Sequence, residues 1–141
     1  MEKPVIFIVD DDESVCRALK RLMKSVGLDV RVFTSAKDFL DQGCQNGSGC
    51  LILDVRMPGI DGLELQEKLR ASGSQMPIIF ITAHEDDKAH ERATRMGAVA
   101  FIQKPFEDQV LLDAIYSALP KSSEGEMSPD CRINDTNIGN R

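Results

Sequence analysis

The sequence predicts an α/β domain in which a parallel β-sheet carries helices on both faces. Five short apolar runs alternate with five stretches whose apolar residues recur at helical spacing. Most of these runs lack alternating polar residues, as is typical of strands that are covered on both faces. Short loops join the units, and repeated strand–helix pairs of this kind form parallel sheets with right-handed crossovers.

The first three elements are predicted within residues 4–33. Residues 4–9 form an uninterrupted apolar run and predict the first strand. Apolar residues at helical spacing between 15 and 26 predict a helix with one buried face, and Gly27 is well placed to end it. Polar residues interleave with apolar ones at 30–33, so we expect a second, more exposed strand there.

A short helix and a third strand follow. Ser35, with Asp38 three residues later, is typical of a helix N-terminus. The segment 42–49 is rich in Gly, Asn and Ser and predicts a loop. The apolar run 50–54 then predicts a buried strand that ends in the carboxylate of Asp54, and a Pro-Gly turn follows it.

The next helix, strand and helix are marked by caps and glycines. Asp61 and Glu64 form an acidic analogue of a capping box, and Gly73 closes the helix that they open. The apolar run 77–82 predicts the fourth strand. A weakly apolar helix is expected over about 85–96.

The C-terminal part supplies one more strand–helix pair and a tail. Residues 99–102 predict the fifth strand, and the last helix has an apolar stripe formed by Leu111, Ala114, Ile115 and Ala118. Val110 and Leu112 fall outside this stripe, so we expect them on a surface for a partner or a second copy of the chain. The domain is expected to span 1–119, and the polar segment 120–141 to be a disordered tail.

Composition excludes several classes of function. The 141 residues carry a formal net charge of −6, which disfavours nucleic-acid and anionic-membrane binding because both need a basic surface. No signal peptide is recognised, and no apolar segment approaches the about 20 residues of a membrane span. Cys16 and Cys50 lie in apolar patterns outside any CxxC pair, so we expect buried free thiols and a cytoplasmic location.

The predicted strand ends carry the residues that suggest a function: Asp10, Asp11, Asp12, Asp54, Thr82 and Lys104. Open parallel sheets bind ligands beyond these ends. Converging carboxylates repel one another, and a divalent cation removes that repulsion; ligands that are all oxygen suit Mg²⁺ or Mn²⁺. A lysine and a hydroxyl can stabilise a phosphoryl group, and aspartate can accept one covalently.

Each signal also has a simpler interpretation. A run of acids after a strand is often a solvated turn and helix N-cap, favoured by the helix dipole. An isolated Asp at a strand end is often a turn residue, and a lysine before proline can be an ordinary surface residue. The joint occurrence of such residues at four strand ends favours the metal and phosphoryl site.

Four motifs in this order resemble the receiver domain of bacterial two-component response regulators: VDDDESV at 9–15, LILDVRMPGIDG at 51–62, IIFITAH at 78–84 and AVAFIQKPF at 98–106. The resemblance covers roughly residues 4–119 and is greatest to the NarL/FixJ-type receivers. It implies a flavodoxin-like (βα)5 three-layer sandwich whose five-stranded parallel sheet has the order 2-1-3-4-5.

The resemblance also implies a metal site and a phosphoacceptor. Asp54 would accept the phosphoryl group, and a Mg²⁺ or Mn²⁺ ion would be bound by Asp10, Asp11, Asp54 and the backbone carbonyl of Arg56. Arg56 and His84 match the positions that tune the lifetime of the phosphoryl group. By its residue type, His84 could also be a phosphohistidine or a metal ligand, but an exposed rim residue is the simpler interpretation.

The remaining matched positions imply a switch. Thr82 and Lys104 would contact the phosphoryl oxygens, and the Lys104-Pro105 peptide is expected to be cis. Phe101 matches an aromatic switch residue, although a half-buried strand aromatic fits the sequence equally well. Asp12 matches a variable position and is expected to be only a helix cap.

The function implied is that of a phosphoacceptor in a phosphorelay. The chain would take a phosphoryl group from a sensor histidine kinase or a phosphotransfer protein, repack its surface around the fourth helix, fifth strand and fifth helix, and form a phosphorylation-dependent homodimer. It would turn over no separate substrate. The alternatives are an Asp-nucleophile phosphohydrolase, a flavin-binding flavodoxin and a non-phosphorylated interaction module. The chain would be either a stand-alone regulator or part of a larger protein.

Overall fold

The computed structural model describes residues 4–43 and 48–119. Within these ranges five parallel strands form one sheet in the order β2-β1-β3-β4-β5, as expected. The strands are β1 (Val5–Val9), β2 (Asp29–Phe33), β3 (Gly49–Asp54), β4 (Ile78–Thr82) and β5 (Ala100–Gln103). The helices that alternate with them are α1 (Glu13–Ser25), α2 (Ala36–Asp41), α3 (Gly62–Ala71), α4 (Asp87–Arg95) and α5 (Asp108–Ala118).

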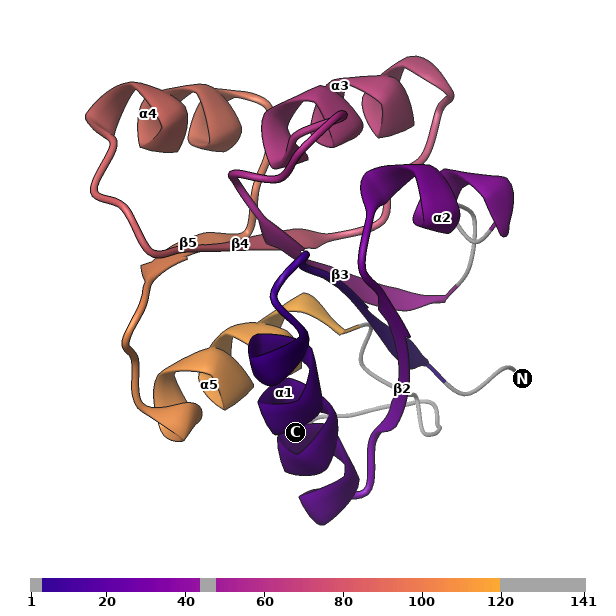
Figure 1. The fold of residues 1–141 in the computed structure, drawn as a ribbon, viewed down its shortest axis with the longest axis vertical. Helices are drawn as coiled ribbons and strands as arrows, with labels where there is room; N and C mark the ends of the chain where they lie inside the picture. Colours follow the sequence, from indigo (N-terminus) through magenta and orange to yellow (C-terminus); the bar gives the residue numbers. More distant parts are fainter. Residues whose placement is uncertain (1–3, 44–47, 120–141) are drawn as a thin grey trace, which may run out of the picture.

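Helices cover both faces of the sheet. In Figure 1, α1 and α5 lie on one face, and α2, α3 and α4 lie on the other. The side chains of β1 alternate between the two layers: Phe7 and Val9 pack with α2 and α3, whereas Ile6 and Ile8 pack with α1 and α5. This two-sided burial explains why the central strands are uninterrupted apolar runs, while β2 at the edge keeps polar residues.

The helix ends follow the predicted capping chemistry. Asp12 accepts hydrogen bonds from the first turn of α1, and Ser35 accepts one from Asp38 N–H at the start of α2. Asp61 and Glu64 make both hydrogen bonds of a capping box. The predicted start of the fourth helix shifts by two residues, because Asp86 is the N-cap and α4 begins at Asp87.

The prediction for the last helix was half wrong. Val110 is 47% exposed, as expected, but Leu112 is only 7% exposed and packs in the layer formed with α1. A helix that is pressed onto a sheet and a neighbouring helix at once buries a stripe wider than one row of residues. Leu112 therefore belongs to the core and cannot serve as a docking residue.

Further expectations concern the tail, membrane-spanning helices and the cysteines. The predicted tail 120–141 and part of the predicted loop 42–49 lie outside the described residues. Among the described helices, none is both long and apolar enough to cross a membrane. Cys16 and Cys50 are buried free thiols, as predicted.

Candidate functional site

The carboxyl ends of four strands bring the predicted site residues together. Asp10 follows β1, Asp54 is the last residue of β3, Thr82 is the last residue of β4, and Lys104 follows β5. Because all the strands run in the same direction, these ends share one edge of the sheet. Residues that are up to 94 positions apart in the chain thus lie within contact of one another.

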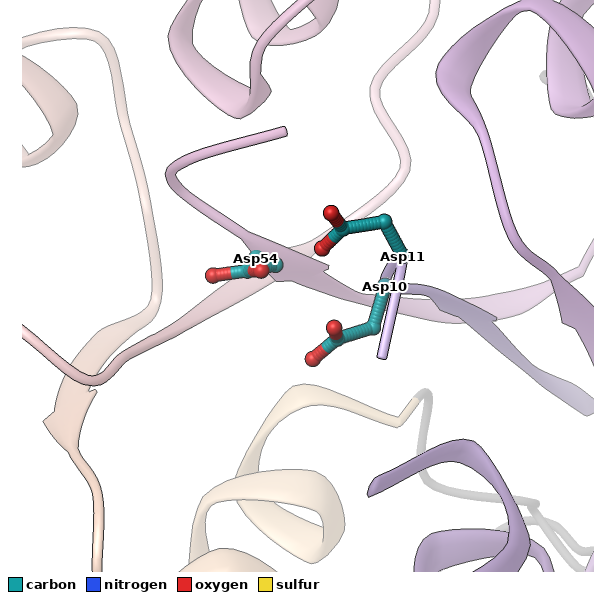
Figure 2. A group of neighbouring side chains, drawn as sticks. All are labelled: Asp10, Asp11 and Asp54. Atoms are coloured by element: carbon teal, nitrogen blue, oxygen red, sulfur yellow. The ribbon is translucent and has the colours of Figure 1, made fainter. Parts of the chain in front are cut away.

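Three carboxylates form a cluster at this edge. Each of Asp10, Asp11 and Asp54 offers an oxygen, and these oxygens all lie within 4.8 Å of one another. Asp10 and Asp54 are buried, while Asp11 is exposed. Figure 2 shows the side chains of Asp10 and Asp11 leaving adjacent backbone positions and reaching toward the side on which Asp54 lies. Two carboxylates of the cluster are therefore buried, and the third is exposed to solvent.

The electrostatics of the cluster suit a cation. Burial, followed by the negative charge of Asp10, raises the pKa of Asp54 from 3.8 to about 7. The positive charge of Lys104 and a hydrogen bond from the Arg56 backbone N–H act in the opposite direction but do not cancel the increase. A divalent ion with oxygen ligands would remove this repulsion, so the donor set fits Mg²⁺ or a similar hard cation.

Lys104 contacts Asp10 rather than Asp54. Its Nζ lies 3.1 Å from Asp10 Oδ2, and Asp10 Oδ1 accepts a hydrogen bond of 2.9 Å from the Asp12 backbone N–H. The Lys104 backbone N–H donates to the Thr82 carbonyl at 2.7 Å, and the Lys104-Pro105 peptide is cis, as predicted. The lysine side chain is 19% exposed, so it lines the edge of the site with its charge partly desolvated.

Thr82 is buried and interacts with the loop that follows it. Its Oγ1 accepts a hydrogen bond from the His84 backbone N–H at 3.2 Å and donates one to the His84 carbonyl at 3.3 Å. The His84 side chain is exposed, in agreement with the expectation of a rim residue. The Thr82 hydroxyl is therefore held by local backbone, and a new acceptor at Asp54 would have to compete with these bonds.

Phe101 lies half-buried on β5 and contacts two other rings. The His90 ring of α4 stacks on it with centroids 4.6 Å apart and an angle of 5° between the planes. The Phe80 ring is tilted against that of Phe101, with centroids 5.9 Å apart. A cavity of about 180 Å³ adjoins the pair and is lined by His84, Glu85, Asp86, Asp87, His90, Phe101 and Gln103. The ring thus has a defined place and free volume beside it.

The comparisons with known proteins match this geometry. A family model described as the response regulator receiver domain matches residues 6–116. The chain belongs to this family. The response regulator protein TmoT of Ectopseudomonas mendocina is 49% identical over 118 residues, which cover 84% of this chain and 54% of TmoT.

A second relative supports the resemblance to FixJ-type receivers. The transcriptional regulatory protein FixJ of Azorhizobium caulinodans is 41% identical over 127 residues, which cover 90% of this chain and 60% of FixJ. The crystal structure of FixJ-N matches this receiver with a TM-score of 0.77 and 37% identity, and covers 91% of this chain and 99% of that chain. The expected flavodoxin-like fold and the resemblance to FixJ-type receivers are confirmed. The chain spans about half the length of the first curated relatives that it matches.

The receiver also depends on residues that the sequence analysis did not single out. Gly62 donates its backbone N–H to Val55 carbonyl at 2.9 Å, and a Cβ added at Gly62 would lie 2.2 Å from the Asp54 carbonyl oxygen. The available signal was a glycine directly after the N-cap Asp61. The role of Gly62 depends on how α3 packs against the end of β3, which the local sequence does not specify.

Proposed function

We propose that this receiver accepts a phosphoryl group on Asp54. The observation that carries the proposal is the convergence of the three carboxylates with Thr82 and Lys104 at one edge of the sheet. Asp54 is the member of the cluster that ends a central strand. Its carboxyl group interacts with the charge of Asp10 and with the backbone N–H of Arg56. It is therefore the acceptor, and Asp10 and Asp11 are its electrostatic surroundings.

The donor is a phosphohistidine of a sensor histidine kinase or of a phosphotransfer protein. An ionised oxygen of Asp54 forms the new P–O bond while the P–N bond of the phosphohistidine breaks. The electron pair of the broken bond returns to the imidazole, which leaves as the neutral ring after taking up a proton. Because the pKa of Asp54 is raised to about 7, a cation beside the carboxylate increases the ionised fraction at neutral pH.

The carboxylates of Asp10, Asp11 and Asp54 and the backbone carbonyl of Arg56 would hold a Mg²⁺ or Mn²⁺ ion. When bound, that ion supplies positive charge for the carboxylates and for the phosphoryl oxygens. Lys104 adds a second positive charge, and its partial burial strengthens the interaction with an incoming anion. The Lys104 ammonium and the Thr82 hydroxyl would both donate to the phosphoryl group.

Phosphorylation then changes the surface of the receiver. A Thr82 hydroxyl that turns to the phosphoryl group gives up its bonds to His84, and the Phe101 ring can move toward the vacated space. The result is a repacked face of α4, β5 and α5, with Val110 as an exposed apolar residue for a phosphorylation-dependent homodimer. Arg56 and His84, at the rim, tune the lifetime of the phosphoryl group.

The receiver serves as a signalling module, with no turnover of a separate substrate and no nucleic acid bound by this chain itself. The net charge of −6 supports the second point. A cytoplasmic location and the 1–119 boundary of the domain are part of the same proposal. The output passes to whatever protein recognises the repacked face.

The test is intact mass after incubation with acetyl phosphate and Mg²⁺. We expect the wild type to gain one labile phosphoryl group and Asp54→Asn to gain none. Failure of the wild type to gain mass with the metal present would contradict the proposal. Steady hydrolysis of a generic phosphate ester by the wild type would indicate a phosphohydrolase instead.

A further inference from the structure

Asp86 uses its two carboxylate oxygens for two different tasks. Oδ1 accepts a hydrogen bond of 3.0 Å from the Ala89 backbone N–H and caps α4. Oδ2 lies 3.1 Å from the guanidinium NH2 of Arg56. Arg56 follows β3 and Asp86 precedes α4, so the ion pair joins the loop after the acceptor aspartate to the start of a helix.

Arg56 is also tied to the acceptor through its backbone. Its N–H donates to the carboxylate of Asp54, two residues earlier. The side chain is 59% exposed and long enough to turn about this fixed backbone. A dianionic phosphoryl group on Asp54 would therefore offer the guanidinium a second anion close to the first, with a geometry that arginine binds well.

The two ends of α4 are attached differently. At the C-terminal end, α3 holds the helix through Gln66 Nε2, which donates to the Ala93 carbonyl at 3.1 Å, and through the ion pair of Glu67 with Arg92. Gln66 is completely buried, so this attachment is shielded from solvent. At the N-terminal end, the ion pair of Arg56 with Asp86 is partly exposed. An anion can displace the N-terminal attachment far more easily than the buried one.

We propose that Asp86 is a positioning residue that competes with the aspartyl phosphate for the Arg56 guanidinium. The inference rests on the proposed phosphorylation of Asp54. Before phosphorylation Asp86 holds the guanidinium away from the acceptor. After phosphorylation, Asp86 and the aspartyl phosphate share the Arg56 guanidinium. The ion pair that holds the first turn of α4 is weakened to the extent that the phosphoryl group takes the guanidinium. By thermodynamic reciprocity, an anion at residue 86 must weaken the hold of Arg56 on the phosphoryl group to the same degree.

The competition has a consequence for hydrolysis of the aspartyl phosphate. In that step a water oxygen forms a bond to phosphorus, the P–O bond to Asp54 breaks, and its electron pair stays on the carboxylate. The proton of the water is lost to solvent. A guanidinium that stays over the phosphoryl group occupies part of the path of the incoming water. Freeing Arg56 from Asp86 should therefore lengthen the lifetime of the phosphoryl group.

The experiment measures the rate of phosphoryl loss after removal of acetyl phosphate, for the wild type, D86N, R56Q and the double variant. Asparagine caps helices as well as aspartate does, so D86N removes the ion pair and keeps α4 capped. D87N is the matched control, because it removes one charge from the same helical turn, on an exposed side chain next to Asp86.

We expect D86N to slow phosphoryl loss about two- to fivefold, the range by which a partly exposed ion pair shifts an equilibrium. D87N should match the wild type, and D86N should make no difference in the R56Q background. An unchanged or faster rate in D86N, or an equal effect with and without Arg56, would overturn the inference. If the wild type gains no phosphoryl group, it is the proposed function that fails. If it does gain one and D86N behaves like D87N, only the positioning role of Asp86 fails.

Discussion

The ammonium of Lys104 lies 3.1 Å from the buried carboxylate of Asp10, and this pair joins the end of β5 to the end of β1 across the intervening strands β3 and β4. Asp10 has no exposed side-chain surface, so Lys104 compensates a charge that water cannot reach. The same contact keeps a cation at the edge of the cluster, where the phosphoryl group of the proposed function would need one.

Replacing Lys104 by methionine should destabilise the metal-free protein at pH 7.5. The buried carboxylate of Asp10 would lose its partner, which costs about 1–3 kcal/mol for a buried group left unsatisfied. The pKa of Asp54 should rise further, because Lys104 is one of the groups that lower it. Urea unfolding in EDTA measures the loss, with Lys68→Met on the exposed surface of α3 as control. Equal stability of the two variants would contradict the role of the pair.

The stability of the metal-free receiver should fall as the pH rises from about 4 to about 7. The pKa of Asp54 is about 7 in the fold and 3.8 in the reference state, so folding favours the protonated carboxyl. That contribution is complete below the lower pKa and is lost as the pH rises through the higher one. Asp54→Asn removes this dependence, and its stability should exceed that of the wild type at pH 8 by on the order of 1 kcal/mol or more.

A bound divalent cation should reverse the difference in stability between the wild type and Asp54→Asn at pH 8. Mg²⁺ that binds the folded cluster stabilises the wild type by mass action, and it should stabilise Asp54→Asn much less. Thermal unfolding at pH 8 with EDTA and then with excess Mg²⁺ measures both effects. A metal-induced increase in melting temperature of the same size in both proteins would place the ion elsewhere.

Gly62→Ala should disturb Asp54 although it adds only a methyl group. The added Cβ would lie 2.2 Å from the backbone oxygen of Asp54, so α3 or the end of β3 must move. Overpacking of this kind typically costs about 1–3 kcal/mol. We also expect weaker Mg²⁺ binding and slower phosphorylation, measured by titration and intact mass. Lys68→Ala, an exposed substitution on the same helix, should leave stability and Mg²⁺ binding unchanged.

Substitutions of Leu112 and Val110, both in α5, should have very different effects on stability. Leu112→Ala creates a cavity in the layer between α1 and α5 and should cost about 2–5 kcal/mol. Val110→Ala removes exposed surface and should change stability by less than about 0.5 kcal/mol. Val110→Ala alone is therefore the informative test of a phosphorylation-dependent dimer. If sedimentation of the phosphorylated protein is the same with and without Val110, this surface is not the interface.

The order of elements and the chemistry of the strand ends could be predicted from sequence, because both depend on local patterns. Apolar periodicity distinguishes strands from helices, and caps such as Ser35 and Asp61 act on the turn that follows them. Parallel strands then bring their ends to one edge, so the topology places Asp10, Asp54 and Lys104 along that edge.

Only the tertiary structure decided which groups touch at that edge. Lys104 pairs with Asp10, the guanidinium of Arg56 turns to Asp86, and Gly62 gives the Asp54 backbone the space it occupies. Leu112 is buried because the rotation of α5 depends on its packing against both the sheet and α1. Such contacts depend on how whole elements are placed, to within about an ångström, and no local pattern along the chain carries that information.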